Sequence, residues 1–262
     1  MKVLRIMLAL LSVSFLVIVH EAGHLVEMRR RNVPIEEFSL GMSFGLPSFV
    51  FHTDLIPEVA FKISPCLLGG YVKPTETGAK LIEAMPLKDQ AVIYGAGVCV
   101  NSWVFVILGI GLQVHRKFHT RKFEIADAVV LFSAVLLWYK LWFCLFLIPV
   151  LGLLLLVQLI FKGGKGLKGV IGAVQEARTT ISSPRKAVIY LALISLGIAL
   201  LNMLPLYPLD GGRLMHVYLS YLSPSVAEVY RRGSAGVVVA LIVLVTMNDI
   251  LSLQKSLQEK QV

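Results

Sequence analysis

Long apolar runs alternate along the chain with stretches rich in charge, glycine or proline. The first run predicts a transmembrane helix over 3–28, which Arg29-Arg30-Arg31 ends. Three later runs predict membrane-spanning helices over 91–112, 187–204 and 234–251. These lengths suit a helix that crosses a hydrocarbon core of about 30 Å. The pattern therefore predicts a helical membrane protein that crosses the bilayer several times.

The stretch 125–161 is also almost wholly apolar, with interruptions at Tyr139-Lys140 and Pro149. It is too long for one comfortable crossing and short for two. We expect two short crossings that turn near Tyr139-Lys140. The fold class is then an all-α polytopic membrane protein with about six transmembrane helices. A version with four helices and a re-entrant stretch is the alternative.

Residues 32–75 break the helical pattern. Glycine and proline recur in this segment, and two short runs, 48–52 and 59–63, look like strands separated by a turn. We expect a small membrane-associated β-hairpin or sheet over 46–75, after the first helix. Irregular backbone at membrane depth is tolerated only where protein or water covers it. Residues 76–90 are polar and are expected on the surface.

Composition supports the membrane assignment and excludes other classes. The 262 residues have a mean hydropathy of +0.78, and 56% of them are hydrophobic. The net charge of +9 is spread over loops, so we interpret it as contacts with lipid headgroups and not as a nucleic-acid site. The three cysteines form no C-x-x-C pair, which argues against a cysteine zinc site and a disulfide framework.

The first apolar run contains an H-E-x-x-H motif, His20-Glu21-Ala22-Gly23-His24. On a helix, residues four apart are offset by about 40° and about 6 Å, so both imidazoles can hold one metal ion. Glu21 is placed beside them to accept a proton from a water on that metal. The motif is short and also arises by chance. Three ionisable groups inside an apolar segment are nevertheless costly and rarely retained without use.

Two histidines leave a catalytic zinc site one protein ligand short. Asp210 is the best remaining candidate, because Pro205 and Pro208 extend the backbone before it and Gly211-Gly212 let a ligand approach closely. The alternative is an N-cap aspartate that opens a helix. We favour a metal ligand, since a deeply placed carboxylate needs a partner. The predicted site is Zn²⁺ held by His20, His24 and Asp210, with Glu21 as the catalytic residue.

The two motifs together resemble the site-2 protease family of intramembrane zinc metalloproteases. That family pairs H-E-x-x-H on one transmembrane helix with N-x-x-P-x-P-x-x-D-G on a later one, which here runs from Asn202 to Gly211. Shorter segments add to the resemblance. Residues 63–73 resemble the family's segment that ends in G-G-Y-V, 97–101 its G-P-x-x-N and 169–172 its G-P-V-G. The last two segments have valine where the family usually has proline.

The resemblance covers roughly 3–112 and 162–251 and implies an activity. A member of this family hydrolyses a peptide bond within or near a transmembrane segment of a membrane protein, as in regulated intramembrane proteolysis. The implied cofactor is Zn²⁺, and the implied partners are the lipid bilayer and a membrane-protein substrate. Many bacterial members carry a PDZ domain before the aspartate-bearing helix. This chain has 125–161 there instead, so we expect a single intramembrane metalloprotease domain over 1–262.

Residues for substrate binding are also expected, and the resemblance implies the first of them. Asn202 is a candidate to hydrogen-bond the released backbone of an unwound substrate, and capping of its own broken helix is the alternative. The strand-like segment 48–72 is expected to pair with the substrate by strand addition. The candidates within it are Gly69, Gly70 and Tyr71.

Other polar residues receive structural interpretations. Asn101 is expected to pack or bond between helices, with a ligand contact as the alternative. His115 and His119 are expected on a solvated face, and His216 on the surface. Two other functional classes compete with the protease. A non-catalytic membrane scaffold of the same fold is the main rival, and a transporter with broken helices is a weaker one.

The depth of the two motifs constrains the topology. Both motifs must meet at one metal, and each lies near the C-terminal end of its helix. The helix over 187–204 must therefore begin on the face where 113–124 emerge, so 125–161 crosses the membrane an even number of times. The resemblance implies a bacterial inner-membrane location with the active site near the cytoplasmic face, although lysine and arginine are slightly more frequent on the other face.

Overall fold

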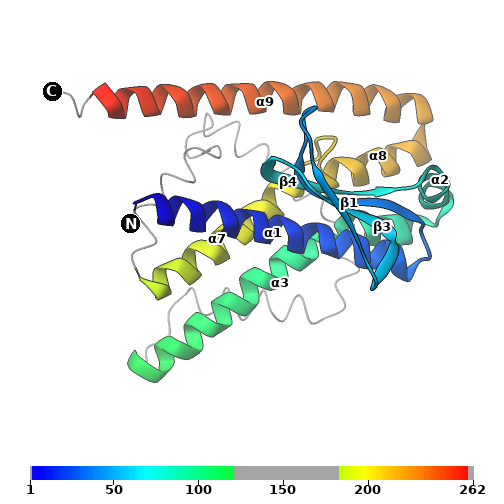
Figure 1. Cartoon of the computed structure of the whole chain (residues 1–262). Coiled ribbons are helices and arrows are strands. Elements are labelled where there is room, and N and C mark those ends of the chain that lie inside the picture. Colours follow the sequence, from blue (N-terminus) through cyan, green and yellow to red (C-terminus); the bar gives the residue numbers. More distant parts are fainter. Residues whose placement is uncertain (1, 121–182, 259–262) are drawn as a thin grey trace.

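The computed structural model describes residues 2–120 and 183–258, and it is mostly helical with one small sheet (Figure 1). Four helical segments in these ranges are long and apolar enough to cross a membrane, and they correspond to the four predicted helices. The spans are Leu10–Arg30, Leu87–Leu112, Pro184–Asn202 and Pro224–Asn248. The two crossings predicted within 125–161 lie outside the described residues, so the count of six stays a prediction.

The helices extend beyond the apolar runs that predicted them. The long ones are α1 (Lys2–Arg30), α3 (Leu87–Thr120), α7 (Pro184–Asn202) and α9 (Pro224–Gln258). Hydropathy marks the part of a helix that suits hydrocarbon, whereas polar turns can continue the same helix into the headgroup region. The start of α7 is specified locally, because the Ser183 side chain caps it by accepting from the Lys186 N–H.

Two shorter helices complete the helical part. The segment expected as polar surface forms α2 (Glu76–Ala84), whose N-cap Thr75 accepts a hydrogen bond from the Gly78 N–H. After the break that follows Asn202, the chain forms α8 (Asp210–Leu222). Asp210 is the first residue of this helix, and it also lies among the other motif residues. The N-cap is Leu209, so the alternative of Asp210 as the N-cap is wrong.

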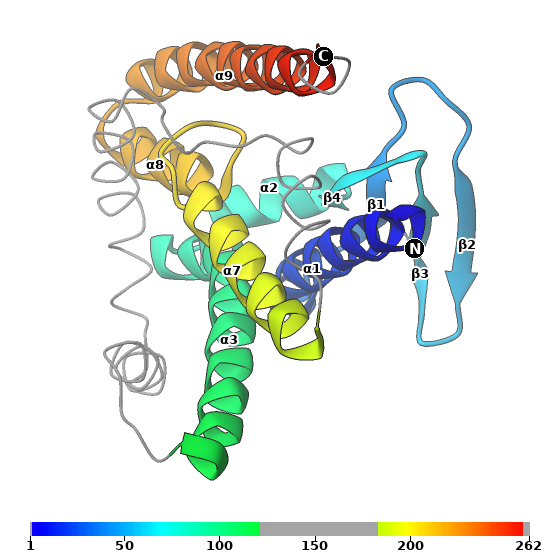
Figure 2. The same cartoon turned by 90° about the vertical axis from the view of Figure 1, so that its left-hand side faces the viewer.

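The helix α3 lies next to the helices that carry the two sequence motifs. It packs against α1, α7 and α8, while α9 runs beside α8 (Figures 1 and 2). The approach to α1 is close: a Cβ on Gly23 would lie 2.9 Å from Val100 Cγ2 and 3.0 Å from the Ala96 carbonyl oxygen. Where α1 ends, Arg31 Nε donates to Asp89 Oδ1 at 3.1 Å and joins it to the first turn of α3.

The sheet has four strands and lies on the opposite side of α1 from α3 and α7 (Figure 2). Its order is β2-β3-β1-β4, with β1 and β3 parallel and the other neighbours antiparallel. The strands are β1 (Ile35–Met42), β2 (Phe49–Thr53), β3 (Ile56–Ile63) and β4 (Cys66–Pro74). The predicted hairpin corresponds to β2 and β3, while β1 and β4 were not expected as separate strands.

A buried apolar cluster fixes the sheet on α1. Phe38, Val59 and Val72 from three strands pack with Leu25 and Met28 from the last turns of α1. Burial of such side chains contributes about 1.5–3 kcal/mol each relative to exposure. The outer end of the sheet is different, because exposed apolar residues gather around the β1–β2 loop and the β2–β3 turn. They include Phe44, Leu46, Phe49, Val50 and Leu55.

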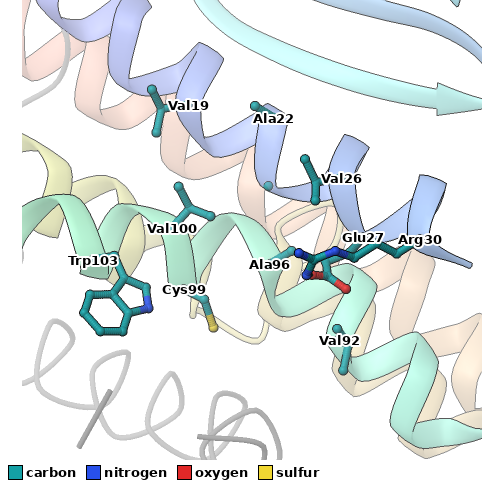
Figure 3. A pocket seen from close by; sticks show the side chains of 11 residues that line it. Val19, Ala22, Val26, Glu27, Arg30, Val92, Ala96, Cys99, Val100 and Trp103 are labelled. Carbon is teal, nitrogen blue, oxygen red and sulfur yellow. The ribbon is translucent and has the colours of Figure 1, made fainter. Parts of the chain in front are cut away.

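An apolar groove of about 520 Å³ lies between α1 and α3 (Figure 3). Val19 and Val26 line it from α1, and Val92 and Trp103 line it from α3. Glu27 and Arg30 stand at one end and form an ion pair of 2.8 Å. None of the four motif residues lines this groove, so it is separate from the candidate metal centre. Its composition fits a helix–helix surface that faces hydrocarbon.

The orientation of the helices agrees with the topology argument. The helix α3 ends and α7 begins at the same end of the helical core, and α2 lies at the other end (Figures 1 and 2). We therefore expect the residues that flank the undescribed segment to lie on one side of the membrane and α2 to lie on the other.

Cysteine labelling can test this arrangement in intact vesicles. On a background lacking Cys66, Cys99 and Cys144, we expect a membrane-impermeant thiol reagent to reach His119→Cys and Lys186→Cys from one face and Lys80→Cys from the other. The physical reason is that a charged reagent does not cross the hydrocarbon core. Labelling of positions 119 and 186 from opposite faces would contradict an even number of crossings between them.

Candidate metal centre

The first part of the site is built on one turn of α1. His20 and His24 project from the same side of this helix towards α3, and they are 4% and 7% exposed. Their Nε2 atoms lie 3.4 Å apart, and their rings meet edge to face with centroids 5.0 Å apart. The helical spacing of four residues thus brings two ligating nitrogens together inside an apolar bundle.

The second part comes from the break between α7 and α8. The backbone turns sharply over 204–209, where the Leu206 N–H donates to the Leu204 carbonyl at 2.8 Å and the Leu209 N–H donates to Leu206 at 2.9 Å. The Tyr207 N–H donates to Ser234 Oγ of α9 at 3.2 Å. Gly211 and Gly212 lie against this turn so closely that a Cβ on either would overlap its backbone. The turn therefore folds tightly onto the start of α8 and places Asp210.

Asp210 meets the two histidines. Its Oδ2 lies 3.1 Å from His20 Nε2 and 3.4 Å from His24 Nε2, and the residue is 8% exposed. This oxygen is buried and has no hydrogen-bond partner within the described residues. A buried carboxylate oxygen without a partner is costly, so the arrangement calls for a cation. No other group of three such ligating side chains was found in residues 2–120 and 183–258.

The dimensions of this triangle fit zinc. Ligand atoms about 2.0–2.1 Å from a tetrahedral Zn²⁺ are separated from one another by roughly 3.3 Å. The three separations here, 3.1, 3.4 and 3.4 Å, have that size. Two imidazoles and one carboxylate are also a ligand set that catalytic zinc sites use, with one position left for water. The residues present therefore fit the metal that the motif predicts.

Each imidazole has a partner for its second nitrogen. His24 Nδ1 lies 2.7 Å from the Ile93 carbonyl oxygen of α3. Since a carbonyl only accepts, His24 donates from Nδ1 and turns the lone pair of Nε2 towards the site. His20 Nδ1 lies 3.3 Å from Asn101 Nδ2, also on α3. Such contacts fix the ring orientation of metal-binding histidines.

Glu21 lies on the side of α1 that faces the sheet. A Cβ on Gly70 of β4 would lie 2.9 Å from Glu21 Cγ and 3.1 Å from Val17 Cγ1. The strand therefore passes directly over this carboxylate, and only glycine leaves room for the contact. Glu21 is next to His20 in sequence, so its side chain starts beside the ligand triangle, and its Cγ lies against β4.

The remaining candidates are distributed unevenly. Asn202 Nδ2 donates to the Ile198 carbonyl of its own helix at 3.0 Å, which matches the capping alternative. Gly69 packs against Met42, and Tyr71 Oη donates to Glu37 Oε1 on β1. Of the three β4 candidates, Gly70 is the one in contact with Glu21.

His216 does not join the ligands. It lines a polar cavity of about 800 Å³ with Tyr207 and Arg231, and its ring centroid lies 6.2 Å from that of Tyr207. Partial burial, assisted by the nearby Arg231 guanidinium, lowers the pKa of His216. The residue is thus partly buried beside α9 and not on the open surface that the sequence suggested.

Comparison with known families is decisive at this point. The family model described as Peptidase family M50 matches residues 8–245, which include all four motif residues. The chain belongs to peptidase family M50. This membership confirms the resemblance to site-2 proteases, and with the four apolar helices it identifies a membrane protein.

Three curated relatives of this family M50 member carry the name "Putative zinc metalloprotease". The one from Clostridium perfringens is 28% identical over 125 residues, which are 45% of this chain and 35% of the relative. The one from Rickettsia conorii is 33% identical over 100 residues, 38% of this chain and 27% of the relative. The one from Synechocystis is 31% identical over 120 residues, 42% of this chain and 31% of the relative. The matches span about a third of the length of these relatives.

Two features of the family M50 site were not identified from the sequence. The Ile93 carbonyl is a backbone group, and no residue type signals its role. Gly97 of α3 closes one side of the site, because a Cβ there would overlap Nε2 of both histidines and lie 2.5 Å from His24 Nε2. The sequence did contain a signal for Gly97, which is the first residue of the segment compared with G-P-x-x-N.

Gly97→Ala tests this close packing. The added methyl group must displace the imidazoles, at a cost of about 1–3 kcal/mol for overpacking. We therefore expect zinc affinity to fall by about 10-fold or more, measured by chelator competition on the purified protein. Gly197→Ala is the matched control, because a Cβ at that position of α7 meets nothing within 4 Å. Equal zinc affinity in the two variants would contradict the proposed position of α3.

Proposed function

We propose that this chain is a zinc-dependent endopeptidase that hydrolyses a peptide bond within or near a transmembrane segment of a membrane protein. The observation that carries the proposal is the triangle of His20 Nε2, His24 Nε2 and Asp210 Oδ2, with sides of 3.1–3.4 Å inside a bundle of membrane-length helices. The relatives' names point to the same metal. We further propose that 1–262 acts as a single intramembrane metalloprotease domain.

The depth of the site supports an intramembrane substrate. His20 and His24 precede Arg30, the last residue of the α1 span, by ten and six positions. At a rise of 1.5 Å per residue they lie about 9–15 Å along the helix from that end. A hydrocarbon core is about 30 Å thick, so the ligands lie within it but towards one face. The scissile bond must reach the same depth.

The roles of the residues follow from their positions. Zinc, when bound, supplies a Lewis acid that polarises the scissile carbonyl and lowers the pKa of coordinated water. His20, His24 and Asp210 would hold it. Glu21 accepts the proton of the attacking water and can return it to the leaving amine. The surrounding apolar helices exclude bulk water, which strengthens the electrostatic interactions in the site.

Substrate binding is proposed along the edge of β4. The sheet order makes β2 and β4 its two edges, while β3 pairs on both sides with β1 and β2. Residues 59–63 belong to β3 and to the segment 48–72 that was expected to bind substrate. They therefore lie inside the sheet and not at its edge. The strand β4 contacts Glu21 through Gly70, so an extended peptide added there would run beside the site. Gly69, Gly70 and Tyr71 would then face the substrate, and Asn202 could turn from its own helix to bind released backbone.

We place the protein in a bacterial inner membrane with the active site towards the cytoplasm. Membership of the site-2 protease family supports this orientation. Arg29, Arg30 and Arg31 follow the site-bearing part of α1, and the labelling experiment above tests which residues share that face.

Removal of single site residues separates metal binding from catalysis. We expect His24→Ala and Asp210→Ala to lose zinc, because each removes one of three protein ligands. Glu21→Gln should keep zinc and cleave a model transmembrane substrate about 100-fold more slowly or worse, the scale of a lost general base. Metal analysis and single-turnover cleavage in detergent micelles provide the two measurements.

The exposed Glu36→Gln on β1 is the control for removal of a carboxylate and should behave as wild type. Undiminished zinc content in folded Asp210→Ala would show that Asp210 is not a ligand. Wild-type turnover by Glu21→Gln would exclude a catalytic role for Glu21, whereas no cleavage by the zinc-bound wild type would favour a non-catalytic scaffold.

Proline substitution tests the β4 edge. At positions of β4 whose N–H does not pair with β1, proline leaves the sheet intact but removes a donor for an added strand. We expect such variants within 67–71, Gly70 excepted because a Cβ there meets Glu21, to slow cleavage and to retain zinc. Equivalent substitutions on the other edge, within 49–53 of β2, are the matched controls and should leave turnover unchanged. Normal turnover in every β4 variant would show that the substrate does not pair there.

A further inference from the structure

The turn that carries Asp210 is contacted by one short stretch of α9. Ser234 Oγ accepts a hydrogen bond from the Tyr207 N–H at 3.2 Å, on the N-terminal side of Asp210. Tyr230 Oη donates to the Gly212 carbonyl oxygen at 3.3 Å, on the C-terminal side. Ser234 and Tyr230 are one helical turn apart, so they lie on the same face of α9. One face of α9 therefore contacts the chain on both sides of Asp210.

The hydroxyl of Ser234 is oriented for this contact by its own helix. Ser234 is 8% exposed, and its Oγ donates to the Tyr230 carbonyl oxygen at 2.7 Å. Because that bond uses the hydroxyl hydrogen, a lone pair of the oxygen is left for the Tyr207 N–H. Within the described residues, Ser234 Oγ is the acceptor found for this N–H. An alanine at position 234 would leave the N–H of the turn without that acceptor.

A third contact reaches the same turn through a side chain. The Arg231 guanidinium carbon lies 5.8 Å from the centroid of the Tyr207 ring, which is within the range of a cation–π interaction. Glu228 fixes this guanidinium by accepting two hydrogen bonds of 2.7 Å, from Nε and from Nη2. Tyr207 is therefore held at both its backbone and its ring by consecutive turns of α9.

Burial along α9 is concentrated at this contact. In the part of α9 whose burial the structure describes, Ala227 and Ser234 are the buried residues, and the others are partly or fully exposed. Exposed apolar residues of the helix include Val237, Val239 and Leu244, which suit hydrocarbon. A buried polar side chain on such a helix is costly unless it is hydrogen-bonded. The hydrogen bond that Ser234 accepts comes from the turn that carries Asp210.

The position of this turn sets the third ligand of the proposed zinc site. His20 and His24 share one turn of α1, so their spacing is fixed by that helix. Asp210 comes from a different segment, and its Oδ2 must stay 3.1 Å and 3.4 Å from the two Nε2 atoms. Such sites must be held within about 0.5 Å of the productive geometry. Contacts that fix the backbone on both sides of Asp210 therefore act on zinc binding.

We propose that Ser234 and Tyr230 are positioning residues that hold Asp210 at the metal from α9. The inference rests on the proposed zinc ligands. Neither side chain touches the metal. Ser234 fixes the backbone at Tyr207, and Tyr230 fixes it at Gly212. Loss of either contact lets the turn move and weakens the carboxylate ligand, whereas the histidine pair on α1 keeps its geometry.

Single substitutions test the two contacts. We expect Ser234→Ala and Tyr230→Phe each to weaken zinc binding by about 10-fold, the lower end for residues that support metal ligands. Ser234→Thr keeps the hydroxyl and should retain the affinity. The matched controls are Ser220→Ala, whose hydroxyl donates to the His216 carbonyl of its own helix, and Tyr221→Phe, which is 61% exposed. Chelator competition on the full chain in detergent micelles gives the affinities.

A double-mutant cycle separates the position of Asp210 from general support of the fold. Asp210→Ala leaves the histidine pair, and Cu²⁺ is the probe because nitrogen ligands bind it more tightly than Zn²⁺. In this background Ser234→Ala should leave Cu²⁺ affinity unchanged, since the carboxylate through which it acts is absent. With Asp210 present, the same substitution should weaken Cu²⁺ binding by about 10-fold. Tyr230→Phe, which removes a single oxygen, replaces Ser234→Ala in the cycle if that variant does not fold.

Two outcomes would overturn the proposal. One is wild-type zinc affinity in both Ser234→Ala and Tyr230→Phe. The other is an equal loss of Cu²⁺ affinity with and without Asp210, which would mean that α9 supports the fold in general. Failure of the wild type to bind zinc would instead refute the proposed function, and the positioning role with it.

Discussion

The fold brings three potential metal-ligating atoms close together in an apolar interior. His20 Nε2, His24 Nε2 and Asp210 Oδ2 lie 3.1–3.4 Å from one another, and all three residues are at most 8% exposed. Burial of an unpaired carboxylate is costly, and lone pairs at this separation repel one another. A divalent cation at their centre reverses the sign of that interaction. Contacts in the rest of the structure keep these three ligand atoms together.

Those contacts come from three helices that the sequence separates widely. One turn of α1 carries both histidines, and the broken segment after α7 carries Asp210. The helix α3 lies against both and contributes contacts of different chemistry. Gly97 allows the rings to approach its backbone, Ile93 fixes one imidazole, and Asn101 contacts the other. Ser195 then ties α7 to α3 at the level of Asn101, so the helix that leads to Asp210 is held in register with His20.

Some of this could be predicted from sequence, because hydrophobic runs and metal motifs have fixed spacings. The features predicted in this way are the four apolar helices, the β2–β3 hairpin and the four motif residues. The strand β1 was missed because its register with β4 shifts between Ile35 and Glu37 and between Leu40 and Met42, which disrupts the alternation of buried and exposed residues. In β4, Gly69 and Gly70 suggested a break, although Gly70 is required by contact with Glu21. The role of Asn101 has no signal in spacing, since one asparagine in an apolar helix has many structural uses.

The two sides of the site differ in a way that bears on the substrate. His20 and His24 face α3, whose backbone at Gly97 leaves no space beyond the rings. Glu21 follows His20 by one residue, which turns it about 100° around α1 towards β4. Under the proposed function, the scissile peptide bond contacts both the metal and this carboxylate, which favours entry on the side of the strand. A helical segment hides its carbonyls and N–H groups in its own hydrogen bonds, whereas an extended one can pair with β4. Under the proposed function, the geometry therefore selects substrate segments that unwind readily, before any side-chain preference is applied.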